Sequence, residues 1–199
     1  MYRKFIFRIK AFLCSPYFLL FLIFDKKGIL TKDLRQWEAV LPVIKQKSTY
    51  LAFIRMFAIY KEYRNLFLYR CGITGDIIKA LTPCMKNLYI TTNKEKLGEG
   101  LVLQHAFSTI IWAEEIGKNC QVWQNVTIGR ARNKEGRPTI GDNVRICTGA
   151  IVVGDIKIGN NVTIGAGTVL TKSVPDNCVV CGNPARVVKE NGIRVNKTL

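Results

Sequence analysis

The stretch IGDNVRICTGAIVVGDIKIGNNVTIGAGTV, residues 140–169, decides the fold of this chain. Divided into sixes from Ile140, it gives blocks that each open with an aliphatic residue and carry a small or β-branched residue at or near the fifth place. Gly, Asp or Asn falls between them, where a turn needs such residues. A short fixed period of this kind indicates a β-solenoid, because each block can form one face of a coil. A meander of ordinary short strands does not explain aliphatic residues that return at every sixth place.

The same pattern extends upstream of this stretch. IGKNCQVWQNVT from Ile116 and LGEGLVLQHAFS from Leu97 repeat it. We expect the aliphatic openers to point inward, and Gly and Asn to occupy corners where φ is positive. Three blocks would complete one triangular coil, and successive coils would pair at the usual strand spacing of about 4.8 Å. The segment RARNKEGRPT, residues 130–139, interrupts the period and predicts an inserted surface loop.

The amino-terminal part of the chain has a helical pattern instead. TKDLRQWEAVL begins with a plausible capping Thr31, has an apolar stripe, and is followed by Pro42, which breaks a helix. YLAFIRMFAIYKEYRNLFLYRCG predicts a second, longer helix that ends at Gly72. We therefore divide the chain into a helical region (residues 1–87), a β-helix domain (88–189) and a tail (190–199).

Residues 1–28 leave two alternatives open. A basic start is followed by an apolar run from Ala11 to Phe24, which is 14 residues long and contains Pro16. A spanning helix needs about 20 residues, and no small-residue cleavage site follows, so we expect neither a transmembrane helix nor a cleaved signal peptide. The segment is either a helix packed against its own protein or an anchor at an anionic membrane surface. Its many aromatic residues favour the anchor.

Charge and cysteine content limit the function classes. The chain has 30 Lys and Arg against 14 Asp and Glu, a net charge of +16, which predicts an anionic partner. No zinc-finger spacing or RNA-binding aromatic motif is present, so we do not expect nucleic acid to be that partner. The seven cysteines are scattered, which is typical of reduced cytoplasmic thiols. Cys178 and Cys181 form a lone pair with no nearby histidine, and we expect no metal site.

The carboxyl-terminal part of the repeat carries a family resemblance. The blocks, ending in VPDNCVVCGNPARVVK at residues 174–189, resemble the hexapeptide-repeat acyltransferases, for which GNPAR is a specific marker. LQHA at residues 103–106, followed by the repeats and by RPTIGDNV, is similar to serine acetyltransferases and to their relatives that acetylate sugars of surface polysaccharides. The resemblance implies a left-handed parallel β-helix, acetyl-CoA as the acyl donor, and a homotrimer with active sites between its subunits.

His105 is the only histidine of the chain and the candidate general base. Acetyl transfer to a hydroxyl requires a group that accepts its proton near neutral pH, and imidazole suits this task. In its block, Leu103 is the inward opener, which predicts that His105 lies at or beside a corner, with Phe107 in the wall of the coil. In the resembling family, the histidine of the L-x-H-A block is the general base, and it corresponds to His105. The alternative is an ordinary core histidine.

Two positions depart from the serine acetyltransferase pattern. That family carries an Asp fifteen residues before the histidine, and Ile90 stands there in this chain. It also carries a second histidine before the proline of the loop, where this chain has Arg137. We therefore expect a backbone carbonyl, Glu114 or Glu115 to orient the imidazole, from the same chain or from a neighbouring subunit.

The remaining site residues follow from the resemblance. Thr148 and Ala166 lie 18 residues apart, one coil, and would line the groove for the pantetheine arm of acetyl-CoA. Arg130 and Arg137 of the loop would bind a charged acceptor, unless the loop is simply a solvated basic segment. The nucleotide end of acetyl-CoA would be held by Thr171, Lys172, Arg186 and Lys189.

These observations predict an acetyl-CoA-dependent O-acetyltransferase. The departures at Ile90 and Arg137, with the basic aromatic start, favour a sugar hydroxyl of a surface polysaccharide as the acceptor. Serine, in cysteine biosynthesis, is the alternative acceptor, and a non-catalytic binding solenoid is the alternative to an enzyme. We expect the protein in the cytoplasm, in peripheral contact with the inner face of the cytoplasmic membrane.

Overall fold

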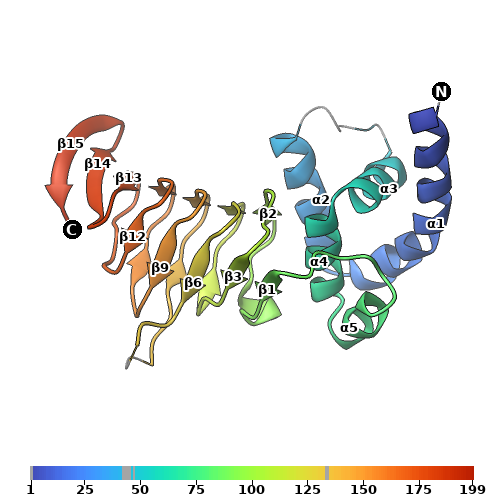
Figure 1. Cartoon of the computed structure of the whole chain (residues 1–199), viewed down its shortest axis with the longest axis horizontal. Helices are drawn as coiled ribbons and strands as arrows, with labels where there is room; N and C mark the ends of the chain where they lie inside the picture. The colour runs from blue at the N-terminus through green and yellow to red at the C-terminus, as the bar shows by residue number, and fades with distance from the viewer. Residues whose placement is uncertain (1, 42–45, 47, 133–134) are drawn as a thin grey trace. The chain divides into compact units, whose positions relative to one another are not determined.

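The computed structural model describes residues 2–41, 46, 48–132 and 135–199, with side chains from residue 9 onward. The chain divides into two compact units, Met1–Met85 and Lys86–Leu199 (Figure 1). The division falls two residues before the boundary expected from the sequence. The first unit is helical and the second is built from short strands, and each is described by itself below.

Within its described residues, the first unit contains five α-helices. They are α1 (Tyr2–Phe24), α2 (Ile29–Val40), α3 (Thr49–Ile59), α4 (Lys61–Arg70) and α5 (Ile73–Lys79). The single long helix expected up to Gly72 is wrong, because the backbone at Tyr60 is extended and separates α3 from α4. The Tyr60 ring instead packs edge-on against Trp37 of α2, with 5.8 Å between ring centroids. Pro42, the expected helix breaker, lies outside the described residues.

Aromatic side chains fill the core of the helical unit. Phe53 of α3 is its centre, with ring centroids 5.1 Å from both Phe21 of α1 and Phe67 of α4. A buried ion pair joins α4 to α2, with Arg70 Nε 3.0 Å from Asp33 Oδ2. Among the helices that the structure describes, none is long and apolar enough to cross a membrane.

The second unit is a parallel β-helix whose strands form three sheets (Figure 1). The first sheet contains β1 (Leu88–Ile90), β3 (Thr109–Ile111), β6 (Thr127–Gly129), β9 (Ile151–Val153) and β12 (Val169–Leu170). The second sheet contains β4 (Glu115–Ile116), β7 (Thr139–Ile140) and β10 (Lys157–Ile158). The third sheet contains β2 (Val102–Leu103), β5 (Gln121–Val122), β8 (Arg145–Ile146), β11 (Thr163–Ile164) and β13 (Cys178–Cys181).

The strand register confirms the repeat and measures its interruption. Arg145 pairs with Thr163, 18 residues later in the chain, which is three blocks of six. The same residue pairs with Gln121, which is 24 residues earlier. The six additional residues belong to the loop at 130–139, between β6 and β7. The aliphatic openers point inward as expected, and Val122, Ile146 and Ile164 are fully buried on successive coils.

Asparagine side chains stack along the corner between the second and third sheets. Asn143, Asn161 and their neighbours in the column have φ between 56° and 57°, which asparagine adopts more readily than most residues. The Asn143 side-chain amide donates to Asn161 Oδ1 at 3.1 Å, and that of Asn161 donates to Asn177 Oδ1 at 2.9 Å. Each coil therefore fixes the corner of the next.

Two antiparallel strands complete the third sheet. β14 (Arg186–Glu190) pairs with β13, and β15 (Ile193–Thr198) pairs with β14. Most of the segment expected to be a tail is therefore hydrogen-bonded into the sheet, because Gly192 takes a positive φ of 85° that allows the chain to reverse.

Candidate active site

His105 lies at the corner between the third and first sheets, where β2 leads into β3. Leu103 pairs with Val122 and Ile110 pairs with Thr127, so seven residue steps span this corner where the next coil uses five. His105 has φ 53° and Ser108 has φ 51°. A left-handed backbone at a non-glycine residue is uncommon and often marks a functional position. Two extra residues thus widen the coil at the histidine.

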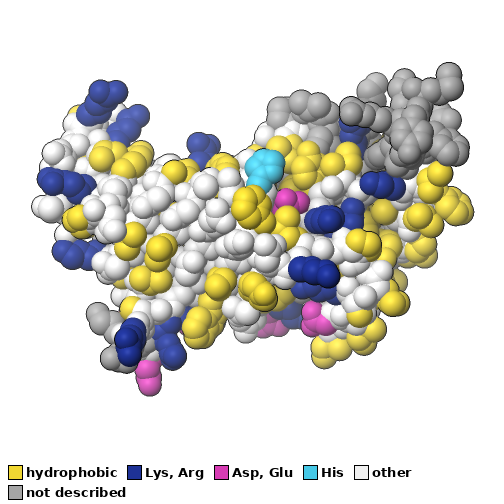
Figure 2. Space-filling view, viewed as in Figure 1, with side chains coloured by type: hydrophobic (Ala, Val, Ile, Leu, Met, Phe, Trp, Pro, Cys, Tyr) yellow, Lys and Arg dark blue, Asp and Glu magenta, His cyan; other side chains and the backbone are white. Residues whose placement is uncertain are grey.

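The backbone around His105 is held on both sides. The Gln104 N–H donates to the Val122 carbonyl at 2.8 Å, and the Phe107 N–H donates to the His105 carbonyl in a tight turn. Leu103 and Ala106 are buried, whereas His105 is exposed, so the turn presents the imidazole to solvent. Figure 2 shows this histidine in cyan on the molecular surface.

The widened corner also corrects an expectation about Phe107. We expected it in the wall of the coil, but its side chain is 43% exposed. The two extra residues shift the chain out of the six-residue phase, so the inward position falls at Ala106. A core role for His105 is likewise wrong.

The acidic residues expected to orient the imidazole have other positions or partners. Glu114 forms ion pairs with Lys96 and Arg137. Hydrogen bonds from Lys96 and then from Arg137 lower the pKa of the Glu114 carboxyl. Glu115 begins β4 in the second sheet, away from the corner that carries His105. Ile90, in place of the family's Asp, pairs with Ile111 in the first sheet.

The predicted pantetheine residues occupy the same corner as His105, on later coils. Thr148 and Ala166 each lie two residues after a paired residue of the third sheet, as His105 lies two residues after Leu103. The Gly167 N–H donates to the Thr148 carbonyl at 2.9 Å, which joins their coils. The structure therefore brings His105, Thr148 and Ala166 into one column, which we call the base column.

Gln124 completes the base column between His105 and Thr148, and the sequence analysis missed it. Its backbone carbonyl accepts a hydrogen bond from the Gly149 N–H at 3.0 Å. Its side-chain Oε1 is buried and has no hydrogen-bond partner among the described residues. A buried polar atom of this kind needs an explanation, such as a ligand that supplies a donor. Its place in the six-residue phase, equivalent to that of Thr148, was the signal that could have identified it.

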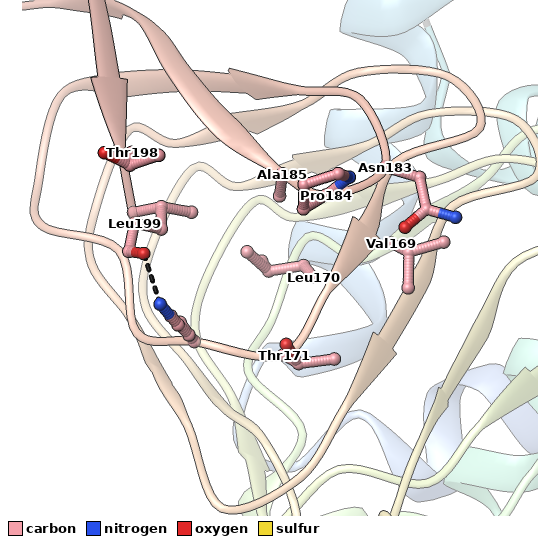
Figure 3. Close-up of a pocket in the computed structure, with 9 residues that line it drawn as sticks. Val169, Leu170, Thr171, Asn183, Pro184, Ala185, Thr198 and Leu199 are labelled. Atoms are coloured by element: carbon pink, nitrogen blue, oxygen red, sulfur yellow. Dashed lines mark hydrogen bonds between the residues drawn. The ribbon is translucent and has the colours of Figure 1, made fainter.

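A pocket of about 330 Å³ lies at the carboxyl-terminal end of the β-helix (Figure 3). It brings Thr171 and Lys172 together with Asn183, Pro184 and Ala185 of the GNPAR segment. The Lys172 ammonium donates to the backbone oxygen of Leu199, the dashed line in Figure 3. Arg186 and Lys189 are exposed on β14 and do not line this pocket. The remaining residues of its lining are Val169, Leu170, Thr198 and Leu199.

The two loop arginines lie at a different edge of the β-helix from His105. Arg130 and Arg137 stand over the Trp112 ring, with guanidinium carbons 5.6 and 5.5 Å from the ring centroid. Arg137 also pairs with Glu114, with Nη2 2.5 Å from Oε2. The Trp112 cluster (Trp112, Glu114, Arg130 and Arg137) lies where the chain leaves the first sheet, whereas His105 lies where the chain enters it. A single chain therefore does not bring the cluster and His105 together. Residues 133 and 134 of the loop lie outside the described residues.

No cluster of three or more His, Cys, Asp or Glu side chains that could hold a metal ion occurs within the part of the chain that the structure describes.

Comparison with known proteins gives consistent matches. Residues 137–172 match the family model described as bacterial transferase hexapeptide (six repeats). The serine acetyltransferase of Staphylococcus aureus strain N315 is 43% identical over 106 residues, which cover 52% of this chain and 50% of that protein. The serine acetyltransferase of Staphylococcus epidermidis is 41% identical over 142 residues, 70% of this chain and 64% of that protein. The chain thus spans about half the length of the S. aureus relative.

Solved structures that resemble this chain are also serine acetyltransferases. The Neisseria gonorrhoeae serine acetyltransferase has a TM-score of 0.59 and 25% identity, covering 85% of this chain and 66% of that one. Serine acetyltransferase from Brucella abortus strain S19, solved in complex with coenzyme A, has a TM-score of 0.58 and 22% identity, covering 84% and 69%. These matches confirm the predicted fold, a left-handed parallel β-helix preceded by helices, of the hexapeptide-repeat, serine acetyltransferase-like kind.

Proposed function

We propose that this serine acetyltransferase-like protein transfers an acetyl group from acetyl-CoA to a hydroxyl, with His105 as the general base and L-serine as the acceptor. The base column carries the proposal. It places an outward-facing histidine in line with Thr148 and Ala166, which the family resemblance assigns to the donor groove. The names of the matched relatives favour serine over the sugar acceptor expected from the sequence.

His105 would first accept a proton and later return it. Its imidazole takes the proton of the acceptor hydroxyl as the oxygen attacks the thioester carbonyl and the new C–O bond forms. A backbone N–H of the column would stabilise the oxyanion of the tetrahedral intermediate. When that intermediate collapses, the C–S bond breaks, and the imidazolium returns the proton to the thiolate of coenzyme A. No covalent enzyme intermediate is required, because the column holds donor and acceptor together.

The donor site would extend from the base column to the carboxyl-terminal pocket. Coenzyme A carries phosphates that cations bind, and Lys172 lines this pocket while Arg186 and Lys189 lie exposed on the adjacent β14. The coenzyme A complex of the Brucella relative is consistent with such a donor. A phosphate group at the pocket would compete with Leu199 for the Lys172 ammonium.

A homotrimer would bring different edges of neighbouring subunits together. In one chain the Trp112 cluster and His105 lie at different edges of the β-helix, so both can serve one site only if the site lies between subunits.

We also propose a cytoplasmic location. All seven cysteines lie within the described residues, and all are free thiols.

An acceptor assay tests the proposed function. Purified protein is incubated with acetyl-CoA and L-serine, release of the coenzyme A thiol is followed with a thiol reagent, and O-acetylserine is identified by mass spectrometry. We expect serine-dependent thiol release that is stoichiometric with O-acetylserine. If folded protein released no thiol with any acceptor tested, that result would instead support the non-catalytic solenoid.

A sugar hydroxyl is the second candidate acceptor, and the Trp112 cluster is the observation that favours it. Aromatic rings and guanidinium groups suit a sugar that carries phosphate or carboxylate. Replacing serine in the assay with hexoses, free and nucleotide-linked, separates the candidates. A kcat/KM for a nucleotide-linked sugar well above that for serine, and lost in Arg137→Ala, would favour this acceptor. Efficient O-acetylserine formation, unchanged in Arg137→Ala, would exclude it.

A further inference from the structure

The outer face of α1 is apolar and exposed. On its inner face, Phe18 and Phe21 pack against Phe53 of α3, with ring centroids 5.6 and 5.1 Å apart. The opposite face bears large hydrophobic side chains at helical spacing, of which Phe12 is 78% exposed. An apolar stripe of this length on a folded unit indicates an interaction surface. The outer face consists of Ile9, Phe12, Leu13, Leu19 and Ile23.

Cations flank this outer face without compensating acids. Lys10 lies at one end, and Lys26 and Lys27 follow the other end, all exposed. Residues 1–24 contain no Asp or Glu. The first acid, Asp25, is used to cap α2, where its Oδ1 accepts from the Leu30 N–H at 2.8 Å. The surface therefore combines an apolar stripe with positive charge at both ends.

The other acidic residues of the helical unit do little to offset this positive charge. Asp33 is buried against Arg70, and Glu38 is buried against Arg35. Up to Ala80 the sequence holds 15 basic and 5 acidic residues. Figure 2 shows hydrophobic side chains over α1 with Lys and Arg beside them.

A pocket of about 350 Å³ opens beside the outer face of α1. Arg64 at this pocket donates to the backbone carbonyls of Phe57, Ala58 and Pro83, and its guanidinium charge meets carbonyl dipoles there. Cations thus border an apolar floor, which suits an amphiphile with a negative head. The apolar part of the lining includes Leu13, Cys14, Tyr17 and Phe57, and the cations are Lys10, Lys61 and Arg64.

We propose that α1 lies in the surface of a membrane that contains anionic lipid, with its outer face in the acyl boundary and its flanking lysines among the headgroups. A bilayer supplies both partners that this surface needs, apolar chains and negative charge. A second copy of the chain fits less well, because pairing two outer faces would bring like charges together. The proposal is independent of the acetyl-transfer activity.

Vesicle flotation of the full chain tests the proposal. The probes are vesicles of phosphatidylcholine alone and of phosphatidylcholine mixed with phosphatidylglycerol. We expect binding to the mixed vesicles, weakened by added salt, and much weaker binding to the neutral ones. The double variant K26A/K27A should lower the partition coefficient about fivefold for each lysine removed. The double variant F12S/L19S should lower it at least about tenfold.

The matched control is Ile193→Ser, which removes an equally exposed apolar side chain from β15, in the other unit. It should bind vesicles like the wild type, and circular dichroism should show all variants folded, because every changed side chain is exposed. Equal binding to neutral and anionic vesicles, or unchanged binding of F12S/L19S, would overturn the proposal. Absence of binding to the mixed vesicles would also overturn it. A dimer, seen by sedimentation, that F12S/L19S dissociates would then show that a second copy covers the face.

Discussion

Replacing Gly141 with Ala should separate two coils of the β-helix. A Cβ at Gly141 would lie 2.6 Å from Asn160 Oδ1 and 2.9 Å from the backbone carbon of Gly159, on the next coil. These contacts are closer than carbon atoms tolerate, and backbone cannot move aside as a flexible side chain can. The same place holds the Gly141 N–H bond to the Ile158 carbonyl, at 2.9 Å, and the Asp142 N–H bond to Asn160 Oδ1, at 2.8 Å.

The cost of this substitution has two parts. Overpacking in a tight site costs about 1–3 kcal/mol. Loss of the Asp142–Asn160 hydrogen bond adds about 1 kcal/mol. We therefore expect the free energy of unfolding of Gly141→Ala to fall by about 2–4 kcal/mol, which lowers Tm by about 5–15 °C in a domain of this size.

Two glycine variants serve as controls. Gly129→Ala lies at the end of β6, and within 4 Å its new Cβ would meet, among the described residues, the Trp112 ring alone, at 3.9 Å, so its stability should change by less than about 0.5 kcal/mol. Gly167→Ala meets nothing within 4 Å but has φ +66°, so it isolates the cost of a left-handed backbone, about 1–2 kcal/mol. The assay is thermal unfolding by circular dichroism at one protein concentration. If Gly141→Ala had the same Tm as Gly129→Ala, the argument from coil spacing would be refuted.

The remaining stability predictions concern the asparagine corner, a buried thiol and a buried ion pair. Asn161→Ala should lower the free energy of unfolding by about 1–2 kcal/mol and Asn161→Gly by less, because glycine keeps the left-handed φ of 57°; urea unfolding compares them. Burial raises the pKa of the Cys120 thiol from its ordinary value of 9.0 to about 12. Stability from this protonated thiol is therefore complete below about pH 9 and falls as pH rises toward 12, by up to about 1.4 kcal/mol per pH unit. Unfolding midpoints across that range should fall more steeply for the wild type than for Cys120→Ala, and parallel slopes would contradict the assignment. Asp33→Ala should leave Arg70 buried without its carboxylate and cost about 3–5 kcal/mol, measured by urea unfolding, whereas a loss below about 1 kcal/mol would show that water or another group compensates.

The β-helix was predictable because its core is a strictly periodic one. An inward aliphatic residue every sixth place is required by the geometry of each coil, so the openers from Ile140 to Ile164 revealed it directly. The break at Tyr60 was not predictable, because neither proline nor glycine marks it. Its extended backbone depends on packing against Trp37, a residue of another helix.

The site was predictable in part, for the same physical reason. The 18-residue spacing of Thr148 and Ala166 places them in one column, and the phase of LQHAFS places His105 at a corner. The sequence did not reveal that two extra residues widen this corner, since the block still looks regular. Trp112 was missed because its contacts with Arg130 and Arg137 arise from the folded loop, and no local pattern announces them.

The most direct test of the account is the acetyl-transfer rate of His105→Asn. Asparagine accepts the left-handed backbone found at this position, and the side chain is exposed, so the variant should fold like the wild type and keep its Tm. We predict that kcat for thiol release from acetyl-CoA with L-serine falls by at least about 100-fold, the usual effect of losing a general base. A folded His105→Asn protein that keeps its kcat within about threefold of the wild type would contradict the central claim, because the imidazole would then not carry the proton.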